Sequence, residues 1–175
     1  MNTRKLTTLA MLIALYIVLS VMTPVKIQNF KFTFEAFPIL MAAILSGPLD
    51  GFIVGTAGSL IYQILFSGYG ITPTTLLWVL PHSLSGLLAG FLAGKFKEHG
   101  FKECAIISIC SALCVTAFNI LALYVDSKLY GYYSKTLVFG NIIIKIIAGI
   151  ILSIIYASVL PRLISFLKRQ LSTGQ

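Results

Sequence analysis

The sequence predicts an all-α membrane protein, built as a bundle of six transmembrane helices. Of its 175 residues, 58% are hydrophobic and only 10% are charged, whereas a soluble domain carries about 25% charged residues. The mean hydropathy is +0.96, and the apolar residues gather in runs separated by short segments rich in glycine, proline or charge. Such runs are typical of helices that cross a bilayer. We therefore interpret residues 1–175 as a single integral membrane domain.

Six apolar runs divide the chain, and most of them are bounded by proline, glycine or charged residues, which stop helices or mark the bilayer surface. The second run is shorter than the roughly 20 residues that a crossing needs, so we expect its neighbours to shelter it. The first run resembles a signal peptide but no A-x-A-like cleavage site follows it, so we expect a retained span. The predicted spans are residues 6–22, 37–45, 52–66, 72–94, 104–124 and 137–160.

The segment after the first span combines charge with aromatic side chains. Within it, residues 30–35 alternate three phenylalanines with lysine, threonine and glutamate, which is the period of a short two-faced strand. We expect a strand-like loop here, and ordinary loops at residues 95–103 and 126–134. The tail, residues 161–175, has a weakly amphipathic pattern that predicts a helix on the membrane surface.

The distribution of lysine and arginine predicts the orientation, because positive residues favour the cytoplasmic side. With six spans and both ends inside, eight basic residues fall in inner segments and four in outer segments, so we expect an N-in, C-in topology. The inner group is Arg4, Lys5, Lys95, Lys97, Lys102, Arg162, Lys168 and Arg169. The outer group is Lys26, Lys31, Lys128 and Lys135.

Polar residues within the spans gather in the outer half of the predicted bundle. Trp78 and His82 are four residues apart and share a helix face, as do Asn141 and Lys145. Asn119 falls in the outer half of its own span. A lysine inside a span costs about 3 kcal/mol on insertion scales, which makes Lys145 a functional candidate by default. The pattern predicts a cup that opens outward and is closed below.

Some of these residues also have an ordinary structural explanation. Trp78 suits the aromatic belt at the membrane interface, while His82 and Asn119 suit hydrogen bonds between helices. Their convergence on the side of the strand-like loop favours a binding site for a flat, anionic molecule. The predicted ligand-binding residues are Lys26, Gln28, Asn29, Lys31, Phe34, Tyr69, Trp78, His82, Asn119, Asn141 and Lys145.

Several function classes are disfavoured by what the sequence does not contain. It has no H-E-x-x-H, G-x-S-x-G or Walker A motif, and its five carboxylates lie outside the predicted span interiors, so a proton relay has little to use. The net charge is +8, but the basic residues form no continuous stripe, which argues against binding of nucleic acid. We expect a non-enzymatic binding protein that needs no cofactor or metal. An intramembrane enzyme using His82 with Lys145 or Glu35, and a structural or pore-forming protein, remain the alternatives.

Three further motifs carry a resemblance to a known family. Ala10-x-x-x-Ala14 is a small-residue face that allows close helix approach, Phe37-Pro38 opens the second run, and Gly47-Pro48-x-x-Gly51 forms the next turn. Together with six spans, the chain resembles the substrate-binding S components of energy-coupling factor (ECF) vitamin transporters. The resemblance implies a multi-pass protein of the bacterial plasma membrane, in which Ala10 and Ala14 dock a shared transmembrane coupling subunit. It also implies two partner ATPase subunits, and toppling of the S component to release its vitamin inside.

The strand-like loop is most similar to that of the folate-specific branch, because its Phe-Thr-Phe-Glu run leads into Phe37-Pro38. The chemistry is compatible with folate. Its flat pterin could stack on Trp78 or a phenylalanine, and the polar edge of the pterin could hydrogen-bond to the amides. The carboxylates of the glutamate part of folate could pair with Lys26, Lys31 or Lys145. No arginine lies in the outer half, so lysines would act as point charges. Pantothenate, riboflavin and thiamine remain open as ligands.

Overall fold

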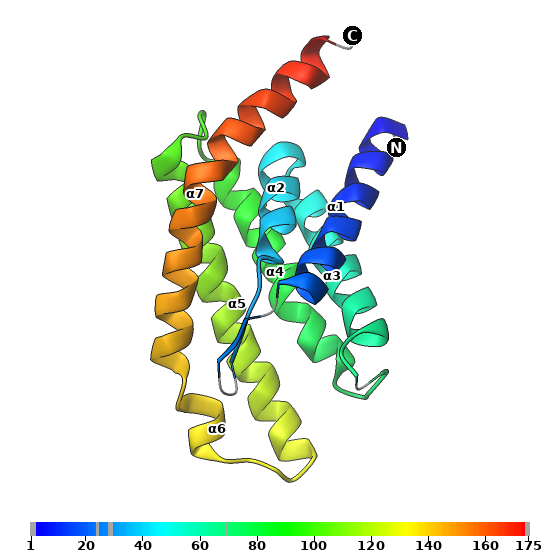
Figure 1. The fold of residues 1–175 in the computed structure, drawn as a ribbon, viewed down its shortest axis with the longest axis vertical. Helices are drawn as coiled ribbons and strands as arrows, with labels where there is room; N and C mark the ends of the chain where they lie inside the picture. Colours follow the sequence, from blue (N-terminus) through cyan, green and yellow to red (C-terminus); the bar gives the residue numbers. More distant parts are fainter. Residues whose placement is uncertain (1–2, 24, 28–29, 69, 174–175) are drawn as a thin grey trace.

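The computed structural model describes residues 3–23, 25–27, 30–68 and 70–173, and confirms a helical membrane fold (Figure 1). Among these residues, four segments are long and apolar enough to cross a membrane: Thr3–Met22, Thr75–Ala93, Phe101–Leu129 and Lys135–Leu167. Both ends of the chain lie at the same end of the bundle (Figure 1). An even number of crossings places the two termini in this way.

Nine elements follow one another along the described chain. The helices α1, α2, α3 and α4 make up the first half, with the strands β1 and β2 between α1 and α2, and α5, α6 and α7 complete the bundle. Their bounds are α1 Thr3–Met22, β1 Val25–Ile27, β2 Phe30–Phe32, α2 Ala36–Ser46, α3 Pro48–Leu65, α4 Thr75–Ala93, α5 Phe101–Leu129, α6 Lys135–Phe139 and α7 Ile142–Thr173.

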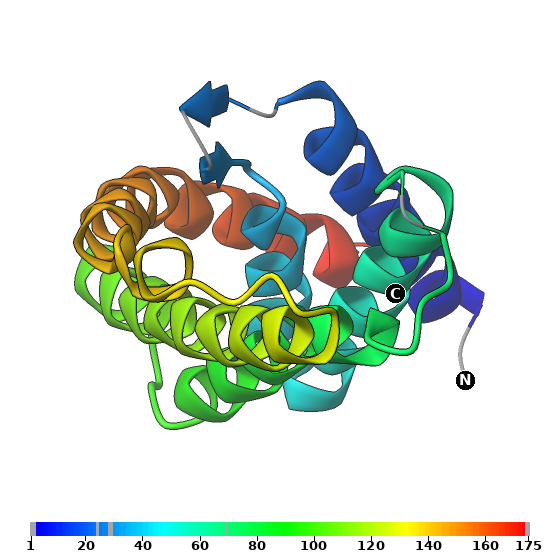
Figure 2. The same ribbon diagram turned by 90° about the horizontal axis from the view of Figure 1, so that it is seen from below.

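Helix α2 forms the centre of the core although it is too short to cross the bilayer. Its 11 residues span about 16 Å, roughly half of the hydrocarbon thickness. Every residue from Pro38 to Ile44 is buried, because α2 contacts α1, α3, α4 and α7. Figure 2 shows α2 enclosed among these longer helices. The predicted sheltering of this run is therefore confirmed, and it explains why α2 is apolar on all faces.

Helices α3 and α4 lie so close together that a side chain would not fit at four of their glycines. A Cβ atom at Gly51 would lie 2.6 Å from the carbonyl oxygen of Gly86, and Cβ atoms at Gly55, Gly86 and Gly90 would each meet backbone of the facing segment. Thr56 and Ser83 add a hydrogen bond of 2.8 Å between the same helices. We call the four glycines the α3–α4 seam, a small-residue contact of the kind that joins helices in membranes.

The strand-like loop is an antiparallel pair of three-residue strands, whereas the alternating pattern predicted one short strand that extends through residue 35. β1 pairs with β2, with Val25 opposite Phe32, Lys26 opposite Lys31 and Ile27 opposite Phe30. The pair lies towards the end of the bundle that is opposite to the termini (Figure 1). Residues 33–35 connect β2 to α2 and lie beside the helices of the bundle.

The second half of the chain differs from the prediction at three points. Helix α5 continues to Leu129, so the loop predicted from residue 126 begins four residues later. The sixth predicted span is divided by a turn at residues 140–141 into α6 and α7. The tail is a direct continuation of α7 through Pro161, whereas a separate surface helix was predicted. The longer α5 is explained by hydrogen bonds from Thr74 and Tyr132 to Asp126. Hydropathy does not predict such contacts between distant residues.

The start of α4 also differs from the prediction. We expected the fourth span to begin at residue 72, but the helix begins at Thr75 after a turn formed by residues 72–74. Side chains stabilise this turn, because the Thr72 amide donates to the Thr75 hydroxyl at 2.8 Å. Threonine hydroxyls that bond to nearby backbone favour turns over helix.

The α3–α4 seam generates the first prediction. Replacing Gly86 with alanine puts a methyl group against the Gly51 carbonyl, and overpacking of this kind costs about 1–3 kcal/mol. We expect Gly86→Ala to lower the thermal unfolding midpoint in detergent by several degrees. Gly94→Ala is the matched control, because its new Cβ would have only ordinary contacts, at 3.6 Å or more. Equal midpoints for the two variants would contradict the tight contact.

Candidate ligand-binding site

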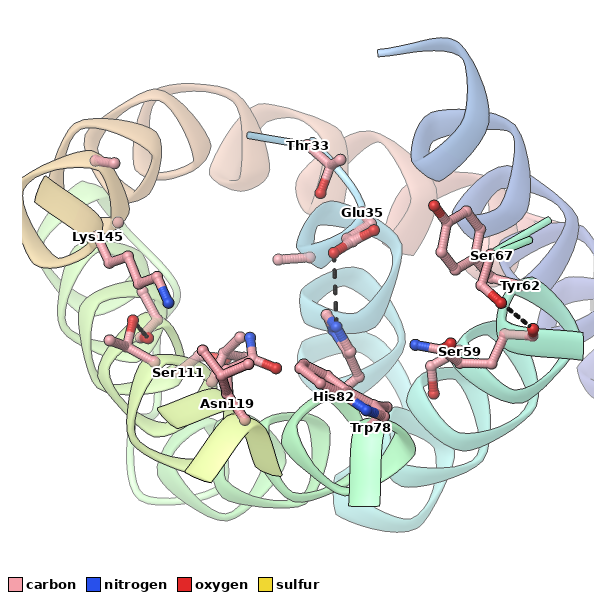
Figure 3. Close-up of a pocket in the computed structure, with 18 of the residues that line it drawn as sticks. Thr33, Glu35, Ser59, Tyr62, Ser67, Trp78, His82, Ser111, Asn119 and Lys145 are labelled. Atoms are coloured by element: carbon pink, nitrogen blue, oxygen red, sulfur yellow. Dashed lines mark hydrogen bonds and ion pairs between the residues drawn. The ribbon is translucent and has the colours of Figure 1, made fainter. Parts of the chain in front are cut away.

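A cavity of about 870 Å³ lies inside the bundle, and its lining extends to Tyr132 in the loop before α6 and to Leu137 in α6. We call it the central cavity. Residues from all of the helices, and from the segment after β2, line it (Figure 3). Its wall includes hydroxyl, amide, carboxylate, imidazole and ammonium groups. Its size is that of a site for a small organic molecule.

Five of the predicted ligand-binding residues line the central cavity together. They are Trp78 and His82 from α4, Asn119 from α5, and Asn141 and Lys145 beside and within α7. Asn141 and Lys145 are one helical turn apart, as their spacing predicted, because the backbone amide of Lys145 donates to the backbone carbonyl of Asn141 at 3.0 Å. Lys145 points into the cavity from the side opposite to His82 (Figure 3).

Phe34 occupies a different place. It is absent from the lining of the central cavity. Its ring packs edge-on against Tyr156 with centroids 6.3 Å apart, and it lines a separate apolar groove with Leu15, Leu19 and Phe37. This placement does not support the predicted contact between Phe34 and a ligand, because the ring packs behind Tyr156, which itself lines the cavity.

Five predicted residues lie wholly or partly outside the described structure. Gln28, Asn29 and Tyr69 are not among the described residues, and for Lys26 and Lys31 only the backbone is described. Their roles stay predictions. Ala10 and Ala14, predicted to dock a partner, are both exposed on α1, away from its buried residues Leu9, Leu12, Tyr16 and Ser20.

One glutamate of the cavity was left out of the predicted ligand-binding residues and was named only as a possible partner of His82 in an enzyme. Glu35 stands immediately before α2 and lines the central cavity. Its Oε2 atom accepts a hydrogen bond of 2.8 Å from the Ser20 hydroxyl, and its Oε1 atom lies 3.5 Å from Nε2 of His82 (Figure 3). The Tyr16 ring packs edge-on against His82 with centroids 5.7 Å apart. An acidic residue directly before a buried helix was the available sequence signal, since the helix N-terminus favours negative charge.

Asp126 is the second carboxylate at the cavity wall, and it joins three segments. The Thr74 hydroxyl, just before α4, donates to Oδ1, and the Tyr132 hydroxyl, in the loop before α6, donates to Oδ2. Asp126 itself is buried, at 8% exposure. This cluster fastens the loop of residues 130–134 to the rim of the cavity. The sequence placed Asp126 in a solvated loop, because its partners are distant along the chain.

The chemistry of the lining is that of recognition. Among the described residues, the cavity presents an indole, an imidazole, three side-chain amides, one lysine and two carboxylates. Within the same part of the chain, no group of three or more His, Cys, Asp or Glu side chains is arranged to hold a metal ion.

The rim cluster generates a prediction about Tyr132. We expect Tyr132→Phe to lower the free energy of unfolding by about 1 kcal/mol, because it removes one hydrogen bond to a carboxylate. Amide hydrogen exchange in residues 130–134 should become faster. Tyr133→Phe is the control, since it keeps the ring that packs on Tyr124 and under Lys128. Unchanged exchange in Tyr132→Phe would show that the hydroxyl does not fasten the loop.

Comparison with solved structures finds the same fold in membrane proteins of one kind. The crystal structure of FolT bound with folic acid has a TM-score of 0.73 and 19% identity, and the alignment covers 92% of this chain and 94% of that one. The S component of a bacterial ECF transporter has a TM-score of 0.67 and 26% identity, over 96% and 99% of the two chains. The S component for biotin from an ECF-type ABC transporter has a TM-score of 0.60 and 20% identity, over 91% and 94%.

Sequence comparison identifies the family. No curated protein matches the chain significantly. The family model described as "ECF transporter, substrate-specific component" matches residues 4–164, which is nearly the whole chain. Its members are substrate-binding subunits of membrane transporters rather than enzymes, which removes the intramembrane enzyme as an alternative. The chain belongs to the substrate-specific components of ECF transporters, and it is an integral, multi-pass membrane protein with a vitamin-binding role.

Proposed function

We propose that the vitamin bound by this S component is folate or a close relative, and that the central cavity is its site. One observation carries the proposal: the cavity combines the indole of Trp78, the amides of Asn119 and Asn141, and the ammonium group of Lys145. A flat heteroaromatic ring stacks on an indole, amides hydrogen-bond to its edge, and a lysine pairs with the carboxylates of the glutamate tail.

The likeness to FolT supports the choice of vitamin. FolT was solved with folic acid bound, and its fold matches 92% of this chain. At 19% identity that likeness concerns the fold alone, so the ligand is assigned here from the side chains of the cavity. Pantothenate, riboflavin, thiamine and biotin are the competing outcomes of the experiment below.

We also propose that the energy for import comes from partner subunits. A transmembrane coupling subunit and two ATPase subunits would complete the transporter, and toppling of the S component would bring the cavity to the inner side. The exposed small-residue face of Ala10 and Ala14 on α1 is the proposed contact with the coupling subunit. Alanines there allow a partner helix to approach closely.

The vitamin is tested by mass spectrometry of ligand extracted from gently purified protein, followed by titration with a vitamin panel. We expect folate from the wild-type protein. Trp78→Ala and Lys145→Ala should each weaken folate binding by at least about tenfold, because one loses the stacking surface and the other loses the cation. Another vitamin in the cavity would overturn the folate assignment and leave the family unaffected.

Matched controls come from the same helix and the same residue type. Leu80→Ala alters an exposed position of α4, and Lys95→Ala alters an exposed lysine in the connector between α4 and α5. Both should bind folate as the wild-type protein does. If the controls weaken binding as much as the cavity variants, the assignment of the site is wrong.

Docking is tested with the double variant Ala10→Leu and Ala14→Leu. Bulkier side chains on this face would separate the two helices, so we expect loss of co-purification with the coupling subunit and ATPases while folate binding is retained. Met11→Leu is the control, because Met11 lies beside this face with 66% exposure and keeps a similar volume. Retained assembly of the double variant would place the contact elsewhere on the chain.

A further inference from the structure

Two carboxylates line the central cavity among the described residues, and their surroundings differ. Each oxygen of Asp126 accepts a hydroxyl hydrogen, from Thr74 and from Tyr132, so Asp126 is occupied in holding the rim. Glu35 accepts one short hydrogen bond, from Ser20 to Oε2. Its Oε1 atom lies 3.5 Å from the His82 nitrogen, beyond an ordinary hydrogen-bond distance. An ionised carboxylate has about four acceptor sites, so Glu35 retains acceptor capacity towards the cavity.

Glu35 is also held in place. It stands at the N-terminal end of α2, whose first turns carry partial positive charge, and α2 is packed in the centre of the bundle. Ser20 on α1 and His82 on α4 contact its two oxygens from different helices. A group positioned by three elements selects ligands by geometry, because it does not adjust to a poorly matched one.

The surroundings of Glu35 indicate what it would contact. Trp78 lies one helical turn from His82 on the same face of α4, so an indole surface lies near the carboxylate (Figure 3). Lys145 projects from the opposite side of the cavity (Figure 3). Glu35 and Lys145 therefore lie on opposite sides of the cavity, with the glutamate beside the aromatic surface (Figure 3).

We infer that Glu35 is a specificity-determining residue that accepts two adjacent N–H donors from the ring of the ligand. The matching group is a fused pyrimidine with a 2-amino substituent beside a ring N–H, which donates two parallel hydrogen bonds to one carboxylate. This inference rests on the proposed function and deepens it. A ring with a carbonyl oxygen at the 2-position would set that oxygen against the carboxylate and leave it unpaired, and sites that bind a specific donor reject analogues that lack it.

The test compares two small probes that differ at this one position. Pterin-6-carboxylate carries the 2-amino group, and lumazine-6-carboxylate carries oxygen there. We expect the wild-type protein to bind the pterin at least about tenfold more tightly than the lumazine. In Glu35→Gln this ratio should fall to about threefold or less, because the amide can donate to the lumazine oxygen. Lys145→Met should weaken both probes alike and keep the ratio.

The outcomes separate this inference from the proposed function. If the wild-type protein binds folic acid but does not distinguish the two probes, Glu35 does not read the ring and the vitamin assignment stands. A ratio unchanged in Glu35→Gln also overturns the inference. If neither probe nor folic acid binds the wild-type protein, the proposed function fails and the inference fails with it. Should Glu35→Gln not fold, the wild-type ratio still decides, since a ratio near one excludes a donor-reading carboxylate.

Discussion

The close approach of α3 and α4 is the contact on which the rest of the structure depends. Glycines on both helices let the two backbones meet, and the contact extends to the site, because a Cβ at Gly55 would meet the carbonyl of His82. Gly58 on α3 packs under the Tyr16 ring, which a Cβ there would meet at 2.6 Å. The same ring lies edge-on to His82. The seam therefore sets the position of the imidazole, and through it the position of the Glu35 carboxylate.

Around this seam, apolar side chains face outward and many polar side chains face inward, which is the reverse of a soluble protein. Large apolar side chains are exposed along α1, α5 and α7, where the bilayer takes the place of water. Polar and charged side chains turn inward to the central cavity. Because helix association in lipid gains little from the hydrophobic effect, packing and hydrogen bonds hold the bundle together. Small residues and hydroxyls are accordingly frequent between α3 and α4.

The cavity has the features of a binding site and few of those of a catalyst. Its two carboxylates are held by neighbours: Ser20 and His82 contact Glu35, and Thr74 and Tyr132 bond to Asp126. A preorganised lining lowers the cost of ordering side chains when a ligand enters. Hydrogen bonds of Asp126 join the start of α4, α5 and the loop before α6 at the rim of the cavity.

Properties that depend on local pattern could be predicted from the sequence. Hydropathy located the long helices, and the even number of predicted spans put both termini on one side. Four-residue spacing put Trp78 with His82, and Asn141 with Lys145, on shared helix faces, and both pairs line the cavity. Properties that depend on contacts between distant residues could not. Glu35 belongs to the site only because Ser20 and His82 meet it from two other helices, Asp126 is buried only because Thr74 and Tyr132 reach it, and Phe34 faces Tyr156 instead of the cavity. Periodicity reports which face of a segment is apolar, whereas the partner of a polar group is decided by how the helices pack.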